Sequence, residues 1–236
     1  MGNTFATPMN RAARRRVQRE TARAQPQKDK EQLEIIARYC GCMEEIKLRT
    51  EVLEGFLTGK ISAKYLPPTV ECECLQFRKI LELIALGSLV AHKEEYSKQR
   101  EKFAQDWHAA RILKEVEKIN PAFYPVPTRQ VRDPTTGRVR ATEDVKEPYL
   151  TRSDFVVLYD KCGDLLHAAN PFGRAKDYEG FARSAIPWLS KIKTLLNHHQ
   201  IQLADKDTQL WVLMVSKDDG KAHAAIMKRG SKVEGT

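Results

Sequence analysis

The sequence predicts a mainly α protein, a helical bundle of about five helices with two small β-hairpins. Apolar residues recur at helical spacing over several long segments. Two short stretches instead place glycine-containing turns between residues typical of strands. The 236 residues, 42% hydrophobic and 30% charged, leave room for one sizeable core with a small appendage.

The first helix is expected from about Asp29, with Gly59 as its stop. Residues 65–68, Tyr-Leu-Pro-Pro, are predicted to be a connector. The helix from Glu73 to about Lys98 is the most apolar, and its apolar side chains cover most of the circumference, so it is predicted to lie at the centre of the bundle. The apolar positions of these two helices are Leu33, Ile36, Ala37, Cys40, Met43, Ile46, Leu53, Phe56 and Leu57, then Leu75, Phe77, Ile80, Leu81, Leu83, Ile84, Leu86, Leu89 and Val90.

A third helix is expected over 101–119, because Asn120-Pro121 ends it. The insert that follows, 121–150, is rich in proline, and its residues 129–140 predict a short β-hairpin about the turn 133–137. A connection of this length is usually functional or mobile.

The fourth and fifth helices are expected over 152–169 and 176–199. Residues 151–154, Thr-Arg-Ser-Asp, supply capping side chains for the fourth helix, and Pro187 is expected to kink the fifth. The segment 208–228 carries the second hairpin signal, about the turn Asp-Asp-Gly at 218–220.

Positive charge is concentrated at the N-terminus. The net charge is +9, and residues 1–26 hold six arginines against Glu20. We therefore expect a disordered basic arm over 1–26, a bundle over 27–200 and a hairpin with a tail over 201–236. Phosphate groups are the ligands that such an arm neutralises, with Arg14, Arg15 and Arg16 as the predicted contacts. A solvated arm without a ligand and an organelle transit peptide are the alternatives.

Several classes of protein are disfavoured by the sequence. No run of about 18 apolar residues and no apolar signal-peptide core occur, so we expect a cytoplasmic protein without a membrane partner. The pairs Cys40/Cys42 and Cys72/Cys74 lie on predicted helices, where side chains two positions apart point to different faces, so no metal and no cofactor is predicted. The neighbouring His198 and His199 have a metal-like composition, but adjacent helical side chains diverge.

Three segments together resemble the HEPN superfamily of α-helical bundle domains: 77–91, FRKILELIALGSLVA; 120–125, NPAFYP; and 159–172, YDKCGDLLHAANPF. The resemblance covers about residues 30–200 and lies in the order of the helices and in the kinds of residues that they carry. It implies either RNA or nucleotide binding or metal-independent ribonuclease activity. The activity depends on a motif in which an arginine is followed by a histidine, and two copies of the motif usually pair across a dimer. In that chemistry the histidine acts as acid or base and the arginine stabilises phosphate charge.

The resemblance carries the histidine over to His167. No arginine precedes a histidine at the family spacing, and Lys161 stands six positions before His167, where it offers a charge without the planar fork of arginine. The predicted catalytic residues are therefore His167 and Lys161. The predicted binding residues beside them are Asp164, Asn170, Arg78 and Glu82, with Arg78 and Glu82 equally interpretable as a structural ion pair within the bundle.

The function predicted from the sequence is an RNA- or nucleotide-interacting module with weak ribonuclease activity of the defence or stress type. The alternative is a non-catalytic module that dimerises or binds a partner protein, as an antitoxin does.

Overall fold

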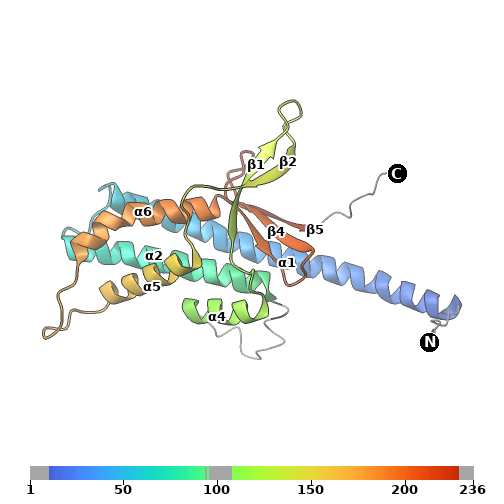
Figure 1. The fold of residues 1–236 in the computed structure, drawn as a ribbon, viewed down its shortest axis with the longest axis horizontal. Helices are drawn as coiled ribbons and strands as arrows, with labels where there is room; N and C mark the ends of the chain where they lie inside the picture. The colour runs from blue at the N-terminus through green and yellow to red at the C-terminus, as the bar shows by residue number, and fades with distance from the viewer. Residues whose placement is uncertain (1–10, 94, 96–107, 229–236) are drawn as a thin grey trace, which may run out of the picture.

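The computed structural model describes residues 11–93, 95 and 108–228, with side chains from residue 29 onward. Helices pack beside an antiparallel sheet in an α+β arrangement (Figure 1). The elements are α1 (Arg11–Leu57), α2 (Leu66–Ala91), α4 (Ala109–Ile119), β1 (Val126–Arg132), β2 (Val139–Asp144), α5 (Arg152–Leu166), α6 (Tyr178–Leu196), β3 (His198–Gln202), β4 (Thr208–Leu213) and β5 (His223–Lys228).

The prediction of a mainly α bundle with two separate hairpins is wrong, because β3 joins both hairpins into one sheet of order β2-β1-β3-β4-β5. Both hairpins form as predicted, β1 with β2 and β4 with β5. The missed strand begins two residues after α6 ends, where the sequence places the end of the fifth helix. Its backbone groups are satisfied by β4 along its whole length and by β1 at Gln200 and His199.

The central position of α2 is confirmed. Phe77, Ile80 and Leu81 are fully buried, and α2 packs against α1, α4, α5 and α6. The helix begins at Leu66, so the predicted connector is wrong. Two prolines occupy its first turn, where their missing N–H groups have no intrahelical partner to lose.

Helix α1 begins at Arg11, so the prediction of disorder is wrong for residues 11–26, while residues 1–10 lie outside the described residues. This segment is rich in alanine, arginine and glutamine, which favour helix without any apolar stripe. α1 continues well beyond the packed body toward its N-terminal end (Figure 1). Its end is as predicted, because Gly59 follows it with a φ of +72°, a conformation that favours glycine.

The remaining helices follow the prediction in order. α4 covers the end of the third predicted helix, and residues 96–107 lie outside the described residues. Thr151 and Asp154 form a reciprocal capping box at the start of α5. Pro187 lies inside α6. Among the described helices, none is long and apolar enough to cross a membrane.

Two buried histidines dock the sheet onto the helices. His199 Nδ1 lies 3.0 Å from the Leu196 carbonyl oxygen and donates to it, so Nε2 accepts from the Tyr39 hydroxyl of α1 at 2.7 Å. His92, just after α2, donates from Nδ1 to the Ser88 carbonyl and accepts from the Asn120 amide at 2.9 Å, and the same amide donates to the Gln202 carbonyl of β3 at 2.7 Å. Burial lowers the pKa of both histidines, that of His199 to about 4, so both are neutral at pH 7.

Candidate functional site

The predicted catalytic histidine lies at the surface. His167 follows the last residue of α5, its side chain is exposed, and its carbonyl oxygen accepts a hydrogen bond from Lys176 Nζ. Asn170 is exposed in the following loop, where its side-chain oxygen accepts from the Phe172 N–H at 3.0 Å. This hydrogen bond closes a local turn, so the Asn170 side chain stabilises the shape of the loop.

Lys161 and Asp164 come together in a pocket of about 240 Å³ between α5 and α6. Asp177, Phe181 and Ser184 also line it, whereas His167 and Asn170 do not. The Lys161 ammonium lies 5.9 Å from the centre of the Trp188 ring, on the side of α6. Within one chain, therefore, the predicted cation and the predicted acid–base group do not meet in a common pocket.

Arg78 and Glu82 tie α2 to α5. The Arg78 guanidinium donates to the Tyr159 hydroxyl at 2.7 Å and lies 4.1 Å from the centre of the same ring. Its Nε is 3.4 Å from a carboxylate oxygen of Glu82. Burial raises the pKa of Tyr159, although the nearby Arg78 opposes this. The pair faces Tyr159 rather than His167, which supports its interpretation as a structural ion pair.

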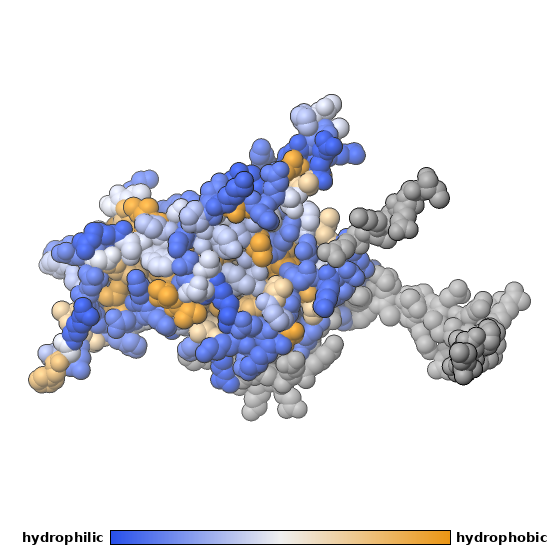
Figure 2. Space-filling model, in the orientation of Figure 1, coloured by the Kyte–Doolittle hydropathy of each residue, from blue (hydrophilic) through white to orange (hydrophobic). Residues whose placement is uncertain are grey.

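The most prominent basic feature with described side chains is the β1–β2 hairpin. β1 pairs with β3 only at Val126 and Pro127, so from Thr128 onward it pairs with β2 alone and the hairpin projects from the body (Figure 1). Between positions 129 and 140 the hairpin holds four arginines and one carboxylate, that of Asp133. Hydrophilic residues cover most of its surface (Figure 2).

The turn of this hairpin is built by Asp133 and Gly137. The Asp133 carboxylate accepts the backbone N–H groups of residues 135 and 136, each at 2.9 Å, and these bonds lower its pKa. Gly137 has a φ of +68°. The ionised carboxylate offsets one of the four positive charges of the hairpin, which leaves a net positive charge on this segment.

Three exposed arginines surround this turn. Arg132 donates to the Gly137 carbonyl at 3.0 Å and to the Gln130 side-chain oxygen at 2.7 Å, which holds its guanidinium against the hairpin. Arg140 lies 3.7 Å from Asp133 and has no opposite residue in the ladder, because the register shifts there. Arg138 has no side-chain partner among the described residues. The three guanidinium groups, here called the arginine tip, are Arg132, Arg138 and Arg140.

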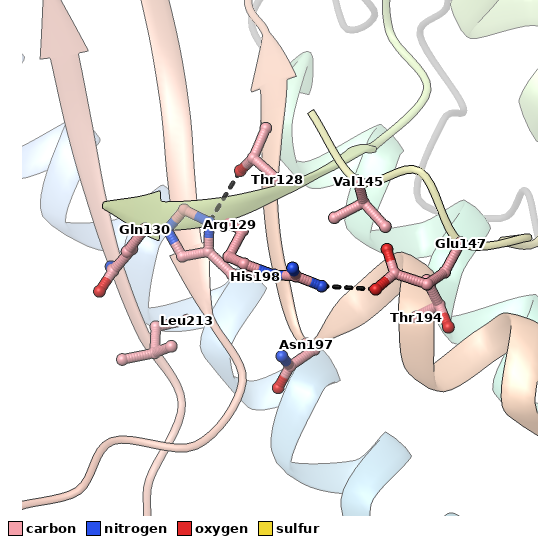
Figure 3. A pocket seen from close by; sticks show the side chains of 9 residues that line it. All are labelled: Thr128, Arg129, Gln130, Val145, Glu147, Thr194, Asn197, His198 and Leu213. Carbon is pink, nitrogen blue, oxygen red and sulfur yellow. Dashed lines mark hydrogen bonds and ion pairs between the residues drawn. The ribbon is translucent and has the colours of Figure 1, made fainter. Parts of the chain in front are cut away.

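A polar pocket of about 320 Å³ lies at the base of the hairpin (Figure 3). Arg129 of β1 reaches across it and pairs with Glu147 at 2.6 Å. His198 of β3, only 5% exposed, shares a hydrogen bond of 2.7 Å between its Nδ1 and the Thr128 hydroxyl. Burial lowers the pKa of His198, so its ring is neutral at pH 7. The full lining is Thr128, Arg129, Gln130, Val145, Glu147, Thr194, Asn197, His198 and Leu213.

Sequence reasoning missed this pocket because its residues come from β1, the 145–147 segment, α6, β3 and β4. The strand β3, His-His-Gln-Ile-Gln, is too short and too polar to predict a strand from its sequence. Among the described residues, no group of three or more His, Cys, Asp or Glu side chains is arranged to hold a metal ion. Cys40 and Cys42 lie on α1, and Cys72 and Cys74 on α2, all with free thiols.

No protein-family model, curated protein or solved structure matches this chain.

Proposed function

We propose that this protein binds RNA in the cytoplasm through the arginine tip of the β1–β2 hairpin. The observation that carries the proposal is the gathering of Arg132, Arg138 and Arg140 around one exposed turn that projects from the body. Guanidinium groups bind phosphate oxygens in a planar fork, and each phosphate contact releases condensed counterions. The resemblance of the sequence to HEPN domains favours RNA over DNA.

The N-terminal part of α1 supplies the second contact in this proposal. Its arginines, Arg14, Arg15 and Arg16 among them, continue the same helix that packs into the core. A helix carries its charges at fixed spacing, so the segment offers a basic rod rather than a flexible tail.

We assign binding rather than cleavage to the chain. His167 does not line the pocket that holds Lys161, and the nearby Lys176 ammonium is bonded to the carbonyl oxygens of Asp164 and His167. Neither lysine is therefore placed to stabilise phosphate charge beside the His167 ring in a transition state. RNA that stays intact in the presence of the protein, with and without EDTA, supports this assignment, and cleavage that is lost in His167→Ala contradicts it.

The test is the affinity for a labelled 20-nucleotide RNA as salt is raised. Replacing Arg132, Arg138 and Arg140 by alanine removes up to three phosphate contacts, so the slope of log Kd against log salt becomes shallower by about 2. The matched control removes three exposed cations elsewhere, Lys79, Lys118 and Arg183. A control variant that changes the slope as much as the hairpin variant contradicts the assignment. Tighter binding to DNA of the same sequence contradicts the choice of RNA.

Self-association is a second candidate function, favoured by a groove of about 860 Å³ between α1 and α6. Val52, Ile61 and Ile186 line it and are 39%, 43% and 62% exposed. Its rim carries Glu51 and Lys60, neither of which has a partner among the described residues. A patch holding both signs of charge is self-complementary about a two-fold axis, so the proposed occupant is a second copy of the chain.

Light scattering during size-exclusion chromatography tests this candidate. Ile186→Glu places a charge in the groove and is expected to yield monomer from dimer. Leu75→Glu, at a 43% exposed leucine outside the groove, is the control and keeps the wild-type mass. A wild-type protein that is monomeric at high micromolar concentration rejects self-association without bearing on RNA binding.

A further inference from the structure

The pocket at the base of the hairpin has the parts of a site for a flat polar ring. Val145 and Leu213 supply apolar surface, and the Arg129 guanidinium, held by Glu147, supplies a charged plane (Figure 3). Unstacked bases of single-stranded RNA stack on guanidinium planes as well as on aromatic rings. The volume of about 320 Å³ lies within the range of small-ligand sites.

Three polar side chains of the pocket keep hydrogen-bonding atoms available, and two of them are held in place. The side-chain oxygen of Gln130 accepts from Arg132 at 2.7 Å, so the side-chain amide is oriented with its NH₂ group left to donate. His198 is held at Nδ1 by Thr128, and no described residue bonds its Nε2. The Asn197 amide, exposed at the end of α6, likewise has no side-chain partner in the described part of the chain. Fixed hydrogen-bonding groups beside apolar walls read the edge of a base.

The pocket also adjoins the arginine tip, because Arg132 bonds to the Gln130 side chain that lines the pocket. Arg129 and Gln130 lie on the same strand as Arg132, two to three residues away, which is less than about 10 Å along an extended strand. Successive phosphates of an extended nucleic-acid strand are separated by a comparable distance. A strand whose phosphates contact the tip therefore places a neighbouring base at the mouth of the pocket.

We propose that this pocket takes one unstacked base of an RNA strand whose phosphates lie along the arginine tip, and that it prefers a base bearing a carbonyl group. The proposal rests on the proposed RNA binding. The oriented Gln130 NH₂ is a donor, and uracil, cytosine and guanine present carbonyl oxygens that accept from it. Adenine has only ring nitrogens as acceptors, and its two-bond contact with a glutamine amide also needs the Gln130 oxygen, which Arg132 occupies.

The experiment compares oligo(U) with oligo(A) of twelve nucleotides by fluorescence anisotropy at fixed salt. Wild-type protein is expected to bind oligo(U) about tenfold more tightly, which corresponds to one good base contact. Asn197→Trp places a bulky ring at the pocket from an exposed position and is expected to remove this preference while leaving the salt slope unchanged. Thr194→Trp, on the α6 wall, blocks the same pocket and serves if Asn197→Trp lowers the melting temperature.

The outcomes separate the two proposals. No preference in wild type, or a preference that survives both pocket variants, overturns the base pocket and leaves RNA binding standing. A hairpin variant, with Arg132, Arg138 and Arg140 replaced by alanine, that binds RNA like wild type overturns the proposed function itself. A preference lost in both pocket variants, with the salt slope retained, supports the base pocket.

Discussion

The buried hydrogen bond between Tyr39 and His199 makes stability depend on pH, and the perturbation we propose is His199→Gln. Glutamine keeps one donor and one acceptor at this position but does not titrate. In the wild type, burial lowers the pKa of His199 from 6.5 to about 4. Because the folded pKa lies below the unfolded one, the unfolded chain binds a proton first as pH falls, so stability is complete above about pH 6.5 and declines toward pH 4.

The difference between the folded and unfolded pKa values of His199 corresponds to a loss of about 3 kcal/mol of unfolding free energy once the pH is below both values. Between pH 7.5 and 5.5 the loss is about 1 kcal/mol. His92 and His198, whose pKa values are also lowered, add losses of the same sign. Urea unfolding at pH 7.5 and 5.5, for wild type and His199→Gln, isolates the contribution of His199. The variant is expected to lose about 1 kcal/mol less than wild type over this interval. Parallel losses in the two proteins would refute the reasoning.

Three further predictions concern the fold. Phe77→Ala, at a fully buried position in α2, is expected to cost about 3–5 kcal/mol of unfolding free energy in urea titrations, and a cost below 1 kcal/mol rejects the central placement of α2. Thr151→Ala removes the capping box of α5 and is expected to cost about 1 kcal/mol of unfolding free energy, and an unchanged thermal unfolding transition contradicts a stabilising role of this cap. Gly59→Ala is expected to destabilise by about 1 kcal/mol because of its positive φ, whereas Gly41→Ala, inside α1 with open space around it, is expected to stabilise by about 0.5 kcal/mol; equal effects contradict this backbone argument.

Sequence patterns predicted the elements whose signals are local. The apolar circumference of α2, the capping residues of α5 and the glycines of both hairpin turns each depend on neighbouring residues, and each appears in the structure. The predicted start of α2 is wrong because paired prolines are typical of connectors, although the first turn of a helix also tolerates them.

The fold class was wrong because one strand decides it. β3 has little intrinsic preference for strand, and what makes it a strand is the pairing with β4 and β1 on either side. Without β3 the two hairpins are separate appendages, and with it they form one sheet.

Of the residues predicted for the site, Lys161 and Asp164 line one pocket and His167 does not, because only the first two are placed by local geometry. Lys161 and Asp164 are three positions apart on one helix, so their proximity is a local property. Whether His167 joins them depends on how the chain leaves α5, which the sequence does not specify. To predict the pocket at the base of the hairpin, one must know that residues 128–130, 145–147 and 197–198 are neighbours. That proximity is a property of the sheet topology.

Cross-linking of RNA containing 4-thiouridine, followed by mass spectrometry of the cross-linked peptides, tests the central claim most directly, because it reports where RNA lies on the intact chain. The account predicts cross-links in the peptides that contain residues 126–147 and 197–198, reduced when Arg132, Arg138 and Arg140 are replaced by alanine. Cross-links confined to the surface around His167 and Lys161, unchanged by that replacement, would contradict it.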